Sequence, residues 1–455
     1  MRDLAFVAFL MAFLGLGFRK PFLFVLAYVY IDVVAPQRLT YFLLNSVPIS
    51  LLTVGLAVLG WAFVDDKRDV RVAPRQALML LLLIYCGVTT TIADFPINAA
   101  EKWDWVWKAL AFAIFLPLTL RTKLRIEALA LFMIISAATI IIVGGIKTLV
   151  SGGGYGVLNL MVDNNIGLYE GSIISTVSIC IVPLILHLRK YGTIFPTDWR
   201  VNLFCAGLIF ACLLIPIGTQ ARTGLVCIAV LAVLSLRAAK RRFLYLFLMA
   251  AAVPAAMAML PSAFTDRMDT IKGYKSDKSA GTRLAVWMWT LDYVKEHPFG
   301  GGFDAYRGNN LRFETIVEEE SGGHTEVKAK VQEDCARAYH SSYFEMLGEQ
   351  GYPGLALWLA INIIGIVRME FLRRQFRKSD GEDERWIGSL AEALQHAHII
   401  YMVGAAFVGI ALQPFVYMLI GMQIGLDTYA KRRAGDAAWT PFAGSKPKPA
   451  WTAGR

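Results

Sequence analysis

Residues 126–146 read IEALALFMIISAATIIIVGGI, an apolar stretch with one carboxylate, bounded by Arg125 and Lys147. A helix of about 20 apolar residues crosses the roughly 30 Å hydrocarbon core of a bilayer, so this stretch predicts a transmembrane helix. Further runs of this kind lie at 4–17, 22–34, 46–64, 76–93, 104–120, 171–188, 202–217, 223–236, 243–260, 352–368, 398–412 and 414–429. Since the first two and the last two are short, we expect an all-α, polytopic membrane bundle of about 12 transmembrane helices.

The composition of the whole chain agrees with that class. Of its 455 residues, 56% are hydrophobic and 18% are charged, and the mean hydropathy is +0.51. A soluble globular chain is about a quarter charged. The values therefore exclude a disordered protein, a secreted disulfide scaffold and an ordinary cytosolic enzyme. Five of the six cysteines lie in apolar runs and only Cys335 lies in a polar stretch, a pattern that predicts neither disulfides nor a zinc site.

The Lys and Arg residues separate between the two sets of alternate loops. One set, with the C-terminal segment, carries 28 of them, whereas the opposite short loops carry only Arg38, Lys102, Lys147 and Arg222. Cytoplasmic loops hold the excess of Lys and Arg, so the first set and the C-terminus are predicted to be cytoplasmic. If residues 4–34 form two helices, counting back places the N-terminus on the far side. The net charge of +10 then reflects topology and gives no reason to expect a nucleic acid as partner.

One long polar segment, residues 261–345, lies on the external side by this count. It carries 11 basic and 14 acidic residues, and loops of such length are usually functional or disordered. Four of its large side chains recur at helical spacing: Leu284, Trp287, Leu291 and Val294. This spacing predicts a helix on the membrane surface or packed on the bundle. The predicted divisions are transmembrane helices (1–260), a large periplasmic loop containing short helices (261–345), further transmembrane helices (346–430) and a disordered cytoplasmic tail (431–455).

Three basic side chains at the external face are candidates for chemistry, because charges in or at a membrane are costly and tend to be functional. Arg222 begins an inward-running span, where helix N-terminal amides and a guanidinium together suit a phosphate. Arg283 opens the predicted helix of the polar segment. His340 directly precedes the return into the membrane, and its imidazole suits a general base. The alternatives are a snorkelling arginine, a solvated loop charge and a structural histidine.

Weaker candidates could contact a glycan. Asp163 and Asn165 lie in an external polar loop that is either an Asx-rich turn or part of a sugar-binding cleft. Trp287 lies one helical turn from Arg283. Three tryptophans, Trp103, Trp105 and Trp107, fit an aromatic belt at the membrane interface better than sugar stacking.

Motifs for metal or nucleotide chemistry are missing from the sequence. His396 and His398 have no carboxylate or cysteine at metal-ligand spacing, and neither HExxH nor GxxxxGK[ST] occurs. We therefore expect no metal and no cofactor.

Several of these residues occur in an ordered set of motifs. QARTG (220–224) is followed by Arg283, by HPFGGG (297–302) and by HSSYFEMLGEQGYPGL (340–355). The set resembles the O-antigen ligase and O-antigen polymerase superfamily, which includes bacterial protein O-oligosaccharyltransferases, over about 155–430. RMDTI (267–271) and the polar loop at 163–165 resemble the branch of O-glycosylation ligases associated with exosortase systems.

The resemblance implies a helical membrane enzyme of the bacterial inner membrane whose active site faces the periplasm. Such enzymes transfer a glycan from undecaprenyl diphosphate to an acceptor hydroxyl. Arg222 and Arg283 would bind the diphosphate and His340 would be the base, in a metal-independent reaction that inverts the anomeric carbon. Two positioned arginines can neutralise the leaving group, each contact contributing about 1.5–3 kcal/mol.

The acceptor stays open at this point. Our first hypothesis is the lipid A-core oligosaccharide; the alternatives are a second lipid-linked glycan, as in a polymerase, and a protein hydroxyl. A lipid-linked sugar transporter is the non-enzyme alternative, and it predicts cationic groups along a central pathway. The predicted spans carry few charges in their middle portions, which favours the enzyme.

Overall fold

The computed structural model describes residues 2–40, 47–67, 70, 72–151, 168–237, 278–321 and 324–433. The first helices are α1 (Arg2–Gly17), α2 (Phe22–Val34), α3 (Pro36–Leu39), α4 (Ile49–Phe63), α5 (Pro74–Thr91), α6 (Pro96–Thr119), α7 (Lys123–Ser151), α8 (Gly171–Tyr191), α9 (Trp199–Gly218) and α10 (Arg222–Leu236). They are followed by α13 (Lys278–Glu296), the 3-10 helix η1 (Ala305–Gly308), strands β1 (Asn310–Ser321) and β2 (His324–Cys335), α14 (Ser342–Phe376), α15 (Glu382–Ala405) and α16 (Pro414–Arg433).

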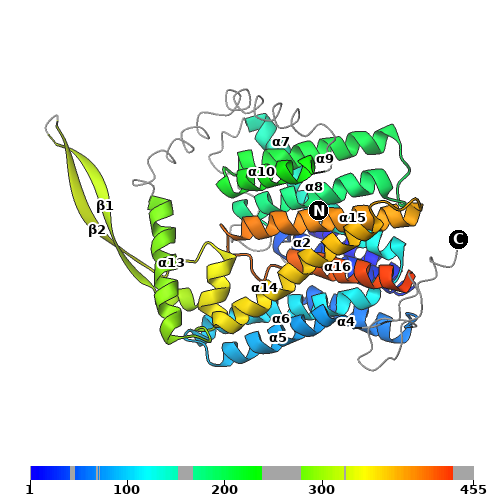
Figure 1. Ribbon diagram of the computed structural model, residues 1–455, viewed down its shortest axis with the longest axis horizontal. Coiled ribbons are helices and arrows are strands. Elements are labelled where there is room, and N and C mark those ends of the chain that lie inside the picture. Colours follow the sequence, from blue (N-terminus) through cyan, green and yellow to red (C-terminus); the bar gives the residue numbers. More distant parts are fainter. Residues whose placement is uncertain are drawn as a thin grey trace.

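Most of the helices run side by side as one bundle, and α13 lies across one end of it, with the β1–β2 hairpin extending away (Figure 1). We call this the loop end. Helices α2, α8, α15 and α16 are the most enclosed, with about two thirds of the residues of each buried. The core is therefore formed by these four helices and the helices packed around them.

The lengths and apolar character of the helices are those of a multi-pass membrane protein. In the described part of the chain, α7, α8, α9 and α14 are long and apolar enough to cross a membrane, and α1, α2, α4 and α10 are shorter apolar helices. Every predicted span except 243–260 overlaps a described helix. Because 243–260 lies outside the described residues, the total of about 12 spans stays a prediction.

The predicted span at 398–412 is wrong in its position. The helix α15 begins at Glu382 and ends at Ala405, and residues 406–413 are irregular. Irregular backbone at this depth is tolerated where the protein itself satisfies its polar groups. Here Ser342 Oγ accepts from the Ile410 amide (2.8 Å), Glu345 Oε2 accepts from the Ala411 amide (3.2 Å), and Trp358 Nε1 donates to the Ala411 carbonyl (2.9 Å).

The all-α class is confirmed for the bundle, but the loop end also contains one β-hairpin where we expected a loop with short helices only. Strands β1 and β2 pair antiparallel from Asn310–Cys335 to Ser321–His324. The sequence carries the signal, since Val327, Ala329 and Val331 alternate with polar residues at the period of a strand. The acidic composition of the segment concealed this pattern.

The helix predicted around 284–294 is confirmed as α13, but its buried face differs from the predicted one. Val286, Thr290 and Val294 are fully buried, at the i, i+4 and i+8 spacing of one helix face. Leu284 and Leu291 are instead exposed. The predicted face is therefore divided, since Trp287 and Val294 pack on the protein whereas Leu284 and Leu291 do not.

A close backbone approach joins α13 to the bundle. Gly351 has a φ of +62° and interrupts α14, and Gly300 has a φ of +84° in the turn after α13. A Cβ atom on either glycine would overlap the backbone of the other segment. Because only glycine adopts these angles without strain and leaves this space, the HPFGGG and GEQGYPG motifs dock on each other.

Candidate functional site

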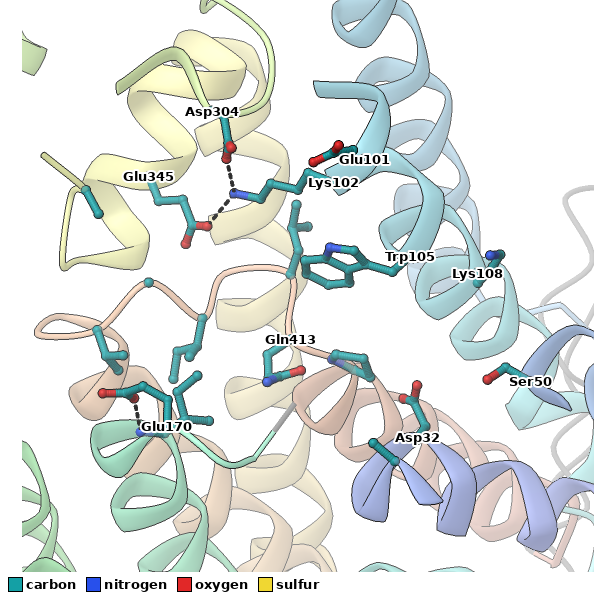
Figure 2. Close-up of a pocket in the computed structure, with 18 of the residues that line it drawn as sticks. Asp32, Ser50, Glu101, Lys102, Trp105, Lys108, Glu170, Asp304, Glu345 and Gln413 are labelled. Carbon is teal, nitrogen blue, oxygen red and sulfur yellow. Dashed lines mark hydrogen bonds and ion pairs between the residues drawn. The ribbon is translucent and has the colours of Figure 1, made fainter. Parts of the chain in front are cut away.

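A cavity of about 870 Å³ opens at the loop end (Figure 2). Its walls come from α2, α4, α6, the start of α8, the turn before η1, the segment 338–340, the start of α14 and the irregular segment 406–413. Helices far apart in sequence thus meet around one space, and the polar segment that we predicted to be external forms part of its wall.

A buried ionic cluster lies in the cavity wall. Lys102 Nζ lies 2.8 Å from Glu345 Oε1, 2.8 Å from Glu349 Oε1 and 4.0 Å from Asp304 Oδ1. The Glu349 side chain is 0% exposed and that of Lys102 is 14% exposed. Burying a charge is costly unless it is paired, so these side chains depend on one another. Figure 2 shows Asp304 and Glu345 reaching Lys102 from opposite sides.

Local structure brings these groups together. Glu345 and Glu349 lie one helical turn apart in α14, so both carboxylates face the same side. Asp304 has a φ of +60°, a left-handed conformation that is uncommon for a residue with a side chain. Its amide donates to Glu349 Oε1 at 3.0 Å. The cluster therefore joins α6, α14 and the turn before η1.

His340 borders the same cavity. The residue has a φ of +48°, and such strained backbone persists where the surroundings enforce it, often at functional sites. Partial burial and the positive charges of Arg283 and Arg337 lower the pKa of His340, while Glu170 opposes this shift. The ring is therefore neutral and able to accept a proton at neutral pH.

Helix α13 holds the segment that carries His340. Trp287 Nε1 donates to the Tyr339 carbonyl at 2.9 Å, and its ring stacks on Phe344 with centroids 4.9 Å apart. Trp287 does not border the described cavity, so its contacts position the backbone beside His340. Its predicted contact with a glycan stays a prediction.

Of the two predicted arginines, Arg283 is close enough to His340 for its charge to act on the imidazole. Arg222 begins α10 directly after Gln220, whose φ is +51°. The turn before Arg222 contacts α8 through a 2.7 Å hydrogen bond between Ser175 and Thr219. The first residues of α8 border the cavity. Arg222 follows this turn and so lies near the start of α8, and neither arginine belongs to the described lining.

Two predicted site residues cannot be placed. Asp163 and Asn165 lie outside the described residues. Whether this loop is an Asx-rich turn or part of a sugar-binding cleft therefore stays a prediction with two alternatives. No group of three or more potential metal ligands was found within the described ranges, and the carboxylates of the ionic cluster face the Lys102 ammonium.

The sequence reasoning missed the acidic character of the cavity. Six carboxylates border it, against two lysines. The acidic residues are Asp32, Glu101, Glu170, Asp304, Glu345 and Glu349, and the lysines are Lys102 and Lys108. One signal was present: carboxylates four residues apart in a strongly apolar region indicate a buried polar face. Trp105, which fitted an aromatic belt, also borders the cavity.

Comparison with protein families identifies two regions. Residues 206–359 match a family described as O-antigen ligase. Residues 1–193 match a family of unknown function. A search of curated protein sequences finds no match. The region 206–359 contains Arg222, Arg283, His340, Glu345 and Glu349.

Proposed function

We propose that the protein transfers a glycan from undecaprenyl diphosphate to an acceptor hydroxyl, because residues 206–359 match a family described as O-antigen ligase. The observation that carries the proposal is His340 in the wall of a cavity at the loop end, on a segment that helix α13 holds through Trp287. By the distribution of Lys and Arg, this end faces the periplasm of a bacterial inner membrane.

His340 acts as the general base in this proposal. A sugar or serine hydroxyl is a poor nucleophile at neutral pH, and a positioned base typically contributes 10²–10⁴-fold to the rate. The lowered pKa of His340 keeps the imidazole unprotonated before the reaction. The charge of Arg283 contributes to the lowered pKa of His340. In this proposal Arg283 therefore both binds the diphosphate of the donor and keeps the base unprotonated.

The charges of the cavity indicate how the substrates are arranged. An interior with six carboxylates and two lysines repels a diphosphate. We place the diphosphate at the rim, toward Arg283 and Arg222, and the sugars in the interior. Carboxylates accept hydrogen bonds from sugar hydroxyls, and the indole of Trp105 offers an apolar face.

The reaction is then a single displacement. The acceptor oxygen forms a bond to the anomeric carbon, the bond from that carbon to the diphosphate oxygen breaks, and the acceptor proton moves to His340. Undecaprenyl diphosphate leaves, with its negative charge neutralised by the arginines. Attack from the face opposite the leaving group inverts the anomeric carbon.

Three acceptors fit this chemistry: lipid A-core oligosaccharide, which is our first hypothesis, a second lipid-linked glycan and a protein hydroxyl. The family match does not separate them, and the exosortase-associated branch also stays an expectation from the sequence. No metal or cofactor is needed for the displacement as written.

The experiment supplies the full-length protein in lipid nanodiscs with an undecaprenyl-diphosphate glycan and each acceptor separately. We expect one acceptor to be glycosylated with inversion, and His340→Gln to lower the rate by about 10²–10⁴-fold. His297→Gln is the matched control, since His297 follows α13 but does not border the described cavity. Retention of configuration, or full activity in His340→Gln, would contradict the proposal.

A further inference from the structure

A second cavity, of about 520 Å³, lies at the end of the bundle opposite the loop end. It is enclosed by α8, α10, the last turns of α14 and the first half of α15. Five basic side chains border it, one or two from each of these helices: Lys190, Arg237, Arg373, Arg377 and Arg385. The cavity is separate from the candidate active site and shares no lining residue with it.

The cations of this cavity exceed the carboxylates near them. Glu392 is the one acidic residue among the described lining residues. Glu370, just outside, pairs with Arg237 at 2.7 Å and Arg373 at 2.9 Å. For Lys190, Arg377 and Arg385, no carboxylate partner was found in the described part of the chain. Three cations are therefore available to an anionic ligand.

The cavity is also divided into a polar and an apolar part along the helix axes. On α8, Pro183, His187 and Lys190 border it in that order, so the wall changes from apolar to basic toward the helix end. Leu231 and Leu234 of α10 extend the apolar part. A small soluble anion needs only the basic part, whereas a lipid with a charged headgroup and acyl chains uses both.

We propose that this cavity binds the phosphate headgroup of an anionic phospholipid, with the start of an acyl chain against the apolar wall. Basic pockets between transmembrane helices at the cytoplasmic face suit such headgroups. An excess of basic residues at this end would arise from topology alone. Topology does not, however, explain why four helices direct these cations at one cavity, while Arg374 and Lys378 of the same region do not border it.

The test is native mass spectrometry of the full-length protein, titrated with phosphatidylglycerol and, separately, with phosphatidylcholine. We expect tighter binding of phosphatidylglycerol. The triple variant Lys190→Gln/Arg377→Gln/Arg385→Gln should weaken phosphatidylglycerol binding by about 100-fold, since three cations that each contribute roughly fivefold multiply to about that factor. Binding of phosphatidylcholine should not change.

The matched control removes three cations of the same end that do not border the cavity, in Arg200→Gln/Arg374→Gln/Lys378→Gln. Its phosphatidylglycerol affinity should stay within about twofold of the wild type. A charge-conserving variant, Lys190→Arg/Arg377→Lys/Arg385→Lys, guards against a loss of folding and should retain binding. Equal losses in the two Gln variants would show diffuse attraction and overturn the proposal.

A competition experiment distinguishes binding of a lipid headgroup from binding of a free anion. Inorganic phosphate at millimolar concentration should leave phosphatidylglycerol bound, because phosphate gains nothing from the apolar wall. Displacement of the lipid by phosphate, or equal affinities for the two phospholipids, would contradict a site for anionic phospholipid.

Discussion

Lys102 binds both carboxylate oxygens of Glu349, at 2.8 and 2.9 Å, although the two residues are 247 positions apart in the chain. The pair connects α6, in the first half of the chain, to α14. Because Glu345 of α14 binds the same ammonium at 2.8 Å and the Ala411 amide through its other oxygen, the pair also supports the cavity wall at 406–413.

Loss of the ammonium should destabilise the protein strongly. Lys102→Met leaves the fully buried Glu349 carboxylate without its cation, and breaking a buried ion pair costs about 3–5 kcal/mol. The measurement is the free energy of unfolding in detergent. Lys108→Met is the control, since Lys108 pairs with the exposed Asp104 one turn away on α6, and such surface pairs contribute about 0–1 kcal/mol.

A second substitution distinguishes the ion pair from simple packing. Glu349→Gln removes the stranded charge, and the Gln side-chain oxygen can still accept from the Asp304 amide. The double variant Lys102→Met/Glu349→Gln should therefore be more stable than Lys102→Met alone. If the two losses merely add, the charges of Lys102 and Glu349 do not depend on one another.

The pH dependence of activity should respond to the charges around His340. Its pKa lies below the usual 6.5, so kcat/KM should be full at neutral pH and fall only as pH decreases through the lowered pKa. Arg283→Gln removes a charge that lowers the pKa, so the acid limb should move to higher pH. Glu170→Gln removes a charge that raises it, so the limb should move to lower pH.

The measurement is kcat/KM against pH for the wild type and both variants, since this ratio reports the free enzyme. Glu170 also caps α8 by accepting from the Ile173 amide at 2.7 Å, and Gln can retain that bond. Shifts of the acid limb in the same direction in both variants would contradict His340 as the titrating base.

The close approach of Gly351 and Gly300 predicts a large effect of one added methyl group. Gly351→Ala places a side chain at a φ of +62° and against the Pro298 carbonyl, and strain of this kind costs about 1–3 kcal/mol. In α9, Gly207→Ala meets no atom within 4 Å and should be neutral or stabilising by up to about 1 kcal/mol. Thermal unfolding of both variants is the measurement, and equal midpoints would contradict the docking of the two motifs.

The parts of the fold that depend on local composition were predictable. Apolar runs located the helices because membrane crossing needs a minimum length of apolar sequence. His340 was a candidate because it precedes the return into the membrane, and it borders the cavity at the loop end. Arg283 was a candidate because it precedes the predicted helix, and it lies within α13; the roles of both residues stay predictions.

The parts that depend on tertiary contacts were not predictable from local composition. Lys102 reads as one of four cations in the external loops, and its partners lie more than 200 positions away. Residues 406–413 are largely apolar and therefore resemble a span, but Ser342, Glu345 and Trp358 satisfy their backbone in an irregular form. The ionic cluster of Lys102 and the irregular segment 406–413 both border the acidic cavity, so the cavity depends on contacts between distant parts of the chain.

The central claim is that the cavity at the loop end holds the lipid-linked glycan. The direct measurement replaces Trp105, which borders the cavity, with a photoreactive phenylalanine analogue, and illuminates the full-length protein with radiolabelled undecaprenyl-diphosphate glycan. Trp199 is the matched control, because it is 66% exposed at the start of α9 and does not border the cavity. The account predicts cross-linking from position 105, abolished by excess unlabelled donor, and none from position 199. Equal cross-linking from both positions, or none from position 105, would contradict it.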